Sequence, residues 1–318
     1  MSMPIAVVFP GQGAQRPGMG RDFHERFAVS RDAYTEASDA LGLDVARLCF
    51  DEDPRLDETE FTQPCILTTE IAMYRALERE LGLKAAFFGG HSLGEYSALC
   101  AAGVVSLADA AQLTRRRGAL MQRAVPKGAG AMLAVIAKGV AERDLKAELA
   151  PFEVDVANLN SSEQVVLSGA ADGVKRAGEH LARVLDAGHR LVELNVSAPF
   201  HSRLMRPIEP EFAGELSRVA PRLDASRAPS CTSNVSGGFH LASTSSVIDA
   251  LTRQISSPVD WVANMTTLAA AAPRILEVGP GRPLSAFFRT IGRSVGAIVS
   301  VKHAERELAA PPPSGEAT

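Results

Sequence analysis

The chain has 318 residues, of which 46% are apolar and 22% are charged, and its formal net charge is −4. At ~150 residues per domain, this length predicts two folded units or one large unit with an insertion. The charge balance implies no strongly basic face, so nucleic acid is not expected as a ligand. No signal-peptide pattern opens the sequence and no run approaches ~18 apolar residues, so we expect a cytoplasmic protein that does not bind membranes.

Short β-branched runs alternate with longer helical patterns along most of the chain, which predicts a parallel sheet covered by helices. The first strand is expected at Ile5–Phe9, and a helical stretch follows Arg21. The later strand candidates are short and precede glycine or polar residues: 86–89, 230–233, Arg274–Val278 and 295–301. Together these elements predict one α/β body.

The segment 131–196 has a different order of elements, in which strand, helix, strand, strand, helix and strand are predicted at 131–137, 140–149, 154–159, 164–169, 172–185 and 190–196. That order is typical of a ferredoxin-like unit. It predicts a subdomain at 128–199, inserted into a larger sheet domain made of 1–127 and 200–308, with a substrate cleft between the two. The last segment, 309–318, is rich in proline and polar residues and is predicted to be disordered.

The four cysteines, Cys49, Cys65, Cys100 and Cys231, are far apart and form no C-x-x-C pair. This spacing indicates neither a zinc site nor a redox pair. We expect all four to be reduced thiols, mostly buried.

The most specific local motif is GGHSLG, in which Gly90, Ser92 and Gly94 form a G-x-S-x-G pattern between a predicted strand and a predicted helix. Glycines on both sides remove the Cβ clashes of a tight strand-to-helix turn, so the Ser92 hydroxyl can stand at its apex. The alternative is an ordinary glycine-rich turn with an incidental serine. The flanking strand and helix favour a nucleophile.

A serine nucleophile needs a base within hydrogen-bond distance, and seven histidines are available. His24, His180 and His189 lie in or beside amphipathic stretches and are expected in solvent. His91 belongs to the serine turn itself and is expected to point away from the hydroxyl. His201 differs because it follows a strand and a proline turn in NVSAPFHSRLM. It is the favoured base, although the residues alone leave this assignment open.

Acyl transfer also needs two N–H donors for the oxyanion of its tetrahedral intermediate. Leu93, directly after the serine, offers one. The turn FPGQGAQ, with Gln12 between two glycines, offers the other. The same turn could hold a phosphate, but it lacks both the G-x-G-x-x-G spacing and a Walker lysine.

Three consecutive arginines, Arg115, Arg116 and Arg117, lie on the helical pattern LADAAQLTRRRGALMQR. Successive helical residues point about 100° apart, so the third can face inward while the other two face water. An inward guanidinium beside the serine would hold a substrate carboxylate through two parallel hydrogen bonds.

Seven motifs occur along the chain: FPGQG, GHSLGEYSAL, the RG of RRRGALMQ, ANLNSSEQVVLSG, SAPFHSRLM, QISSPVDW and ILEVGPG. Their order and spacing, over roughly residues 5–301, resemble the malonyl-CoA:acyl carrier protein transacylase family. The segment LDETEFTQPCILTTEIAMYRAL is most similar to the freestanding acyltransferases that serve polyketide synthases. The resemblance implies an α/β-hydrolase-like body with a ferredoxin-like subdomain.

The resemblance also implies roles for the residues of the reacting centre. Ser92 matches the acyl-accepting nucleophile, and His201 matches the base that takes its proton. Gln12 and Leu93 match the two oxyanion donors. The backbone carbonyl of Gln254 matches the group that orients the imidazole in place of a triad aspartate.

Substrate selection is implied by four further positions. Arg117 matches the arginine that pairs with the malonyl carboxylate, and Gln63 and Asn160 match polar residues that line the same pocket. Phe200 resembles the bulky residue that accompanies malonyl selection. A buried guanidinium without a partner is unfavourable, so acetyl groups should load poorly.

The activity implied is ping-pong transfer of malonyl from malonyl-CoA to the phosphopantetheine thiol of an acyl carrier protein, with no metal or redox cofactor. Because His201 must be neutral to accept a proton, loading should fall as the pH drops through an ordinary histidine pKa, between pH 8 and 5. Two alternatives stay open: a proofreading hydrolase of the same fold, and a non-catalytic protein that docks carriers. Arg117 disfavours the first, and the joint presence of Ser92, His201 and Arg117 disfavours the second.

Overall fold

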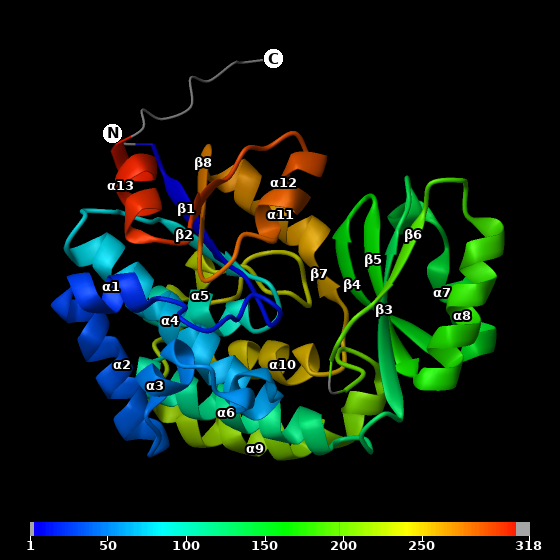
Figure 1. Cartoon of the computed structure of the whole chain (residues 1–318), viewed down its shortest axis with the longest axis horizontal. Helices are drawn as coiled ribbons and strands as arrows, with labels where there is room; N and C mark the ends of the chain where they lie inside the picture. Colours follow the sequence, from blue (N-terminus) through cyan, green and yellow to red (C-terminus); the bar gives the residue numbers. More distant parts are fainter. Residues whose placement is uncertain (1–2, 197, 310–318) are drawn as a thin grey trace.

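The computed structural model describes residues 3–196 and 198–309. It has a mixed α/β fold, in which two sheets and their helices form a large lobe and a small lobe (Figure 1). The helices are α1 (Arg21–Arg26), α2 (Ala28–Leu41), α3 (Val45–Phe50), α4 (Thr59–Arg79), α5 (Gly94–Ala101), α6 (Leu107–Arg123), α7 (Leu145–Leu149), α8 (Ala171–Val184), α9 (Glu209–Val219), α10 (Thr244–Gln254), α11 (Trp261–Ala271), α12 (Leu284–Thr290) and α13 (Val301–Ala309).

The sheet of the large lobe has four parallel strands in the order β2 (Phe87–Gly90), β1 (Ile5–Phe9), β8 (Arg274–Val278) and β9 (Gly296–Ile298). The inner strand β1 is buried on both faces from residue 6 onward, which explains the uninterrupted apolar run IAVVF. This confirms the predicted parallel sheet with helices. Because parallel strands end at the same edge, the loops after β1 and β2 meet there.

The predicted bounds of β1 and β8 are correct, and β2 begins and ends one residue later than predicted. The outer strand β9 is shorter than the predicted 295–301 because a helix replaces its end. Asp22 accepts the backbone N–H of Val301 at 2.7 Å and thereby stabilises the start of α13.

The prediction of a strand at 230–233 is wrong. Only Cys231 pairs with the sheet, through an isolated parallel bridge to Phe88. The chain then turns back on itself, because the N–H of Ser233 donates to the carbonyl of Gly238 at 2.8 Å. Because this turn follows the bridge so closely, the segment is too short to form the repeated backbone hydrogen bonds of a strand.

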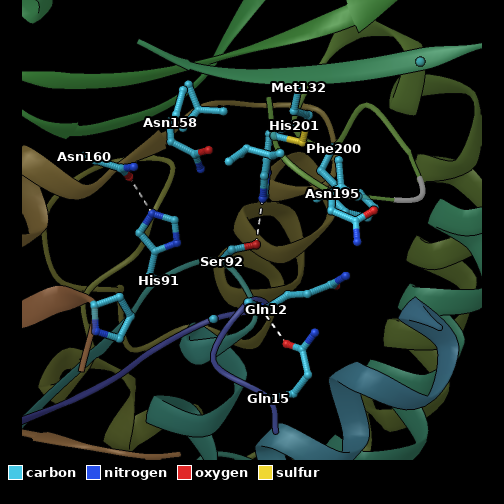
Figure 2. Close-up of a pocket in the computed structure, with 18 of the residues that line it drawn as sticks. Gln12, Gln15, His91, Ser92, Met132, Asn158, Asn160, Asn195, Phe200 and His201 are labelled. Atoms are coloured by element: carbon cyan, nitrogen blue, oxygen red, sulfur yellow. Dashed lines mark hydrogen bonds between the residues drawn. The ribbon is translucent and has the colours of Figure 1, made fainter. Parts of the chain in front are cut away.

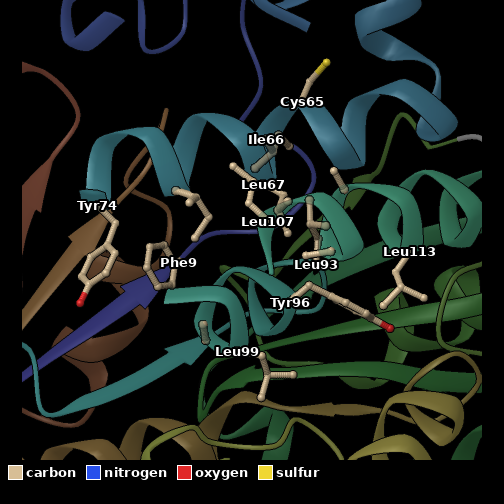
Figure 3. Close-up of a cluster of buried hydrophobic side chains, with 14 of the residues drawn as sticks. Phe9, Cys65, Ile66, Leu67, Tyr74, Leu93, Tyr96, Leu99, Leu107 and Leu113 are labelled. Atoms are coloured by element: carbon tan, nitrogen blue, oxygen red, sulfur yellow. The ribbon is translucent and has the colours of Figure 1, made fainter. Parts of the chain in front are cut away.

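Helix α4 runs through the hydrophobic core of the large lobe (Figure 3). Its Leu67 is fully buried, as is Phe9 of β1. Helix α6 packs closely against the start of α4, since a Cβ added at Gly118 would lie only 2.3 Å from the carbonyl oxygen of Thr59. This close approach positions the residue before the glycine, Arg117, inside the lobe.

The sheet of the small lobe has the order β6 (Arg190–Glu193), β3 (Gly130–Ile136), β5 (Gln164–Ala170), β4 (Val154–Ser161) and β7 (Val259–Asp260). The first four strands come from one continuous segment and pair antiparallel. Strand β7 belongs to the chain of the large lobe and pairs parallel with β4. The backbone of one lobe therefore completes the sheet of the other.

The elements of the small lobe follow the predicted order with two differences. The predicted helix at 140–149 divides into a 3-10 turn, Val140–Glu142, and the short α7. Asp144 causes the break, because its side chain accepts the N–H of Ala147 at 3.2 Å and starts a new helix. Strand β6 ends at Glu193, earlier than predicted.

The C-terminal helix α13 extends to Ala309, so the predicted tail cannot begin there, and 310–318 lie outside the described residues. All four cysteines are free thiols. In the ranges 3–196 and 198–309, no helix has both the length and the apolar character to cross a bilayer.

Candidate active site

Ser92 stands on a sharp turn between β2 and α5, with a backbone φ of 54°. Both neighbouring glycines are required by the backbone of this turn. A Cβ at Gly90 would lie 1.9 Å from the carbonyl oxygen of Gly94, and a Cβ at Gly94 would lie 2.2 Å from that of Phe9. The left-handed conformation of a serine is uncommon and marks a turn that the surrounding structure imposes.

The Gly94 contact gives a stability prediction. We expect Gly94→Ala to lower the free energy of unfolding by about 3 kcal/mol or more, because the new methyl group meets backbone rather than a flexible side chain. Gly214 in α9 is the matched control, since a Cβ there meets nothing within 4 Å. Gly214→Ala should raise stability by up to ~1 kcal/mol. Urea unfolding measures both, and equal effects would contradict the steric argument.

His201 lies beside the serine, although 109 positions separate the two in the sequence. Its Nε2 is 2.7 Å from Ser92 Oγ (Figure 2), and its Nδ1 is 2.8 Å from the backbone carbonyl of Gln254. A carbonyl only accepts, so Nδ1 carries the proton and Nε2 is left to accept from the serine hydroxyl. The imidazole thus has the tautomer of a general base.

The base is buried and electrostatically perturbed. The pKa of His201 is lowered from 6.5 to about 3, mainly by burial and secondly by the nearby positive charge of Arg117. The carbonyl of Gln254 opposes this effect only in part. His201 is therefore neutral throughout the physiological range.

Arg117 faces inward and is only 1% exposed. It donates through Nη1 to Gln63 Oε1 at 3.0 Å, and through Nη2 to Gln254 Oε1 at 2.8 Å and Ser92 Oγ at 3.2 Å. No carboxylate of the described residues forms an ion pair with it. By contrast, Arg115 and Arg116 lie on the outer side of α6 and pair with surface glutamates. A buried guanidinium beside a serine hydroxyl is thus ready for an anionic partner.

The two residues predicted as oxyanion donors, Leu93 and Gln12, lie at the serine turn and in the loop packed against it. Leu93 directly follows the serine, and Gln12 lies in the loop after β1, with its side chain bonded to Thr59 Oγ1 at 3.1 Å. Neither N–H has an acceptor among the described residues. The loop is pressed against the serine turn, because a Cβ at Gly11 would lie 2.5 Å from the carbonyl oxygen of His91.

A cleft of about 940 Å³ opens over this site, between the two lobes. Gln12, Ser92, Asn160, Phe200 and His201 line it (Figure 2). Three predicted site residues, Gln63, Arg117 and Gln254, are buried beneath the serine instead of lining the cleft. In the described ranges no group of three or more histidine, cysteine or acidic side chains is placed to hold a metal ion.

The predicted pocket residues Gln63 and Asn160 are each engaged by another side chain. Gln63 Oε1 accepts from Arg117 Nη1, and Asn160 Oδ1 accepts from His91 Nε2 at 2.8 Å. An amide oxygen only accepts, so Nε2 of His91 carries the proton. His91 therefore points away from the Ser92 hydroxyl, as expected. The contact links the serine turn to strand β4 of the small lobe.

Three residues of the site were not predicted: Glu95, Asn234 and His240. Asn234 Oδ1 accepts the N–H of Ser92 at 2.7 Å, and its Nδ2 donates to the carbonyl of Gly90 at 2.8 Å. Glu95 and His240 are buried and hydrogen-bonded to each other at 2.8 Å. An acidic residue inside the motif GHSLGEYSAL, in an otherwise apolar helix, was the signal that could have revealed this network.

The parallel sheet, the serine on a strand-to-helix turn and the histidine hydrogen-bonded to it define an α/β protein of the serine-nucleophile class. Comparison with known proteins is more specific. The model of the acyl transferase domain matches residues 6–280. The chain therefore belongs to the acyl transferase family, within which it is similar to malonyl CoA-acyl carrier protein transacylases.

Individual relatives agree along nearly the whole chain. The malonyl CoA-acyl carrier protein transacylase of Escherichia coli K12 is 38% identical over 296 residues, which is 90% of this chain and 92% of that protein. The crystal structure of the transacylase from Clostridium perfringens has a TM-score of 0.87 at 35% identity, covering 96% of each chain. A structure of a malonyl-transacylase in complex with a type II polyketide synthase acyl-carrier protein has a TM-score of 0.86 at 33% identity, covering 96% of this chain and 99% of that one.

Proposed function

We propose that this protein transfers a malonyl group from malonyl-CoA to the phosphopantetheine thiol of an acyl carrier protein. The observation that carries the proposal is the buried guanidinium of Arg117, 3.2 Å from Ser92 Oγ and without a carboxylate partner in the described chain. A malonyl group esterified to Ser92 would bring its free carboxylate into this region. An acyl group without a carboxylate would leave the guanidinium unpaired.

The reaction has two halves that use the same residues. Ser92 Oγ attacks the thioester carbonyl while its proton passes to His201 Nε2, and the backbone N–H groups of Gln12 and Leu93 stabilise the oxyanion. The C–S bond then breaks, and His201 returns the proton to the coenzyme A thiolate. In the second half the carrier thiol gives its proton to His201 and its sulfur attacks the carbonyl of the acyl-serine. The ester C–Oγ bond then breaks, and His201 returns the proton to Ser92 Oγ.

Substrate binding also affects the base. The positive charge of Arg117 is one cause of the low pKa of His201, after burial. A malonyl carboxylate paired with the guanidinium would offset that charge, so the pKa of His201 would rise when the matching substrate is bound. Carboxylate recognition and proton transfer would then favour the same acyl group.

The remaining parts of the proposal concern organisation and setting. The strand order of the small lobe, with β3 and β5 central, supports a ferredoxin-like subdomain at 128–199 inserted into an α/β-hydrolase-like domain. The chemistry requires no metal or redox cofactor. A cytoplasmic location suits the four free thiols. Similarity to a transacylase that binds a polyketide synthase acyl-carrier protein supports a role in polyketide as well as fatty-acid biosynthesis.

Intact-mass measurement tests the proposal directly. The protein is mixed briefly with malonyl-CoA, acetyl-CoA or methylmalonyl-CoA, and the acyl adduct is quantified. We expect a malonyl adduct on Ser92, a much smaller acetyl adduct, and rapid loss of malonyl only when a carrier protein is added. Decay at the same rate without carrier would identify a hydrolase, and absence of any adduct would leave a non-catalytic role.

The low pKa of His201 gives a pH prediction that differs from the one drawn from an ordinary histidine. Depression to about 3 keeps the imidazole neutral as the pH falls, so kcat/KM for malonyl loading should change by less than ~2-fold between pH 8 and 5. The substrate should be a malonyl thioester without the nucleotide, because phosphate groups titrate near pH 6. A fall of tenfold toward pH 5 would show that His201 keeps an ordinary pKa.

A further inference from the structure

Glu95 is a fully buried carboxylate in the first turn of α5, three positions after the serine. It accepts three hydrogen bonds: from Gln254 Nε2 at 2.6 Å, from His240 Nε2 at 2.8 Å and from the backbone N–H of Asn234 at 3.2 Å. An ionised carboxylate accepts only, so three converging donors satisfy it as an anion. The mechanism above does not use this group.

The Gln254 side chain connects Glu95 with the reacting centre. Its Oε1 accepts from Arg117 Nη2 at 2.8 Å, and its Nε2 donates to the carbonyl of Ser92 at 3.0 Å as well as to Glu95. Arginine only donates, whereas a carbonyl and a carboxylate only accept. Turning the amide by 180° would therefore place donor against donor and acceptor against acceptor.

We infer that Glu95 is a positioning residue, which holds the Gln254 amide in the one orientation that fixes Arg117 beside Ser92. The inference rests on the proposed role of Arg117 in selecting carboxylate-bearing acyl groups. Glu95 acts through the amide and forms no ion pair with Arg117, so the guanidinium stays available to the substrate. A direct Glu95–Arg117 ion pair would instead compete with the malonyl carboxylate.

The backbone geometry offers a matched pair of variants. In Glu95→Gln, the backbone N–H of Asn234 needs an acceptor, so the new amide places its oxygen on the side that faces both Asn234 and Gln254. The NH₂ group of the new amide then faces His240, whose other tautomer accepts. The hydrogen bond that orients the Gln254 amide is therefore kept. Glu95→Met has a similar length but no acceptor, and Glu95→Asp retains the charge but withdraws the carboxylate by one methylene group. Both release the amide.

The measurement is the ratio of kcat/KM for malonyl loading to kcat/KM for acetyl loading. We expect this ratio to fall about tenfold in Glu95→Met and Glu95→Asp, as for loss of a hydrogen bond to a charged group, and to stay within ~3-fold of wild type in Glu95→Gln. Glu95→Asp keeps the test available if Glu95→Met does not fold. Thermal unfolding of each variant is recorded in parallel.

A double-mutant cycle tests whether Glu95 acts through Gln254. Gln254→Ala removes the side chain but keeps the backbone carbonyl that holds His201, so Glu95→Met should lower the ratio no further in that background. A double variant whose malonyl-to-acetyl ratio falls by the product of the two single losses would overturn the inference. Equal losses of malonyl and acetyl loading in Glu95→Met and Glu95→Asp would also overturn it. Wild-type protein that loads both acyl groups equally would overturn the proposed function itself.

Discussion

Replacement of Ser92 by alanine is expected to lower malonyl transfer by at least ~10⁴-fold, to the background of the uncatalysed reaction. No other hydroxyl stands 2.7 Å from His201 Nε2 in the described chain, so nothing takes over the role of the nucleophile. Transfer to a carrier protein is followed by mass spectrometry, together with the acyl adduct on the enzyme.

The alanine variant should fold normally, because the methyl group occupies less space than the hydroxymethyl group and the turn keeps its glycines. Circular dichroism and thermal unfolding provide this control. Ser202→Ala is a second control. The Ser202 hydroxyl is buried and donates to the carbonyl of Pro199 at 2.7 Å. A malonyl adduct that persists in Ser92→Ala would show that another residue carries the acyl group.

The second large effect is expected at Arg117. In Arg117→Ala, kcat/KM for malonyl loading should fall by roughly 10²-fold, the size expected when one partner of a desolvated ion pair is removed. Acetyl loading should fall much less or increase, because the positive charge that lowers the pKa of His201 is also removed. The malonyl-to-acetyl ratio is therefore the informative quantity.

Arg116→Ala is the matched control for Arg117→Ala. The two residues are adjacent on α6, but Arg116 pairs with Glu211 and Glu215 at the surface, where such pairs contribute little. Both loading rates should remain within ~2-fold of wild type in Arg116→Ala. An Arg117→Ala variant with wild-type preference would disprove the carboxylate-binding role.

The sequence predicted the sheet of the large lobe well where local pattern and burial coincide. Strands β1 and β8 are apolar, short and followed by turn residues, and the structure begins and ends them where predicted. The segment 230–233, SCTS, is also short and precedes turn residues, but it is mostly polar and a turn ends it after one bridge to the sheet. Whether such a run becomes a strand depends on neighbours distant in sequence, which periodicity does not contain.

The site shows the same division. Ser92 could be recognised from the steric demands of its own turn, and the inward direction of Arg117 from helical geometry. His201 was favoured by its context, but only its motif resemblance, and not its spacing, connected it with Gln254. The network of Glu95, Asn234 and His240 joins α5 to the loop that precedes α10 through buried polar contacts. In the sequence Asn234 and His240 resemble solvated side chains, and only Glu95, an acidic residue in an otherwise apolar helix, indicates a buried polar network.

Strand β7 has a consequence for how substrates enter. It pairs with β4 through Asn158 opposite Val259 and Leu159 opposite Asp260, so the chain of the large lobe is hydrogen-bonded into the sheet of the small lobe. The two lobes cannot move apart at this point without breaking the pairing of β4 with β7. The long, slender phosphopantetheine arm that coenzyme A and carrier proteins share can reach Ser92 through the cleft without such a movement.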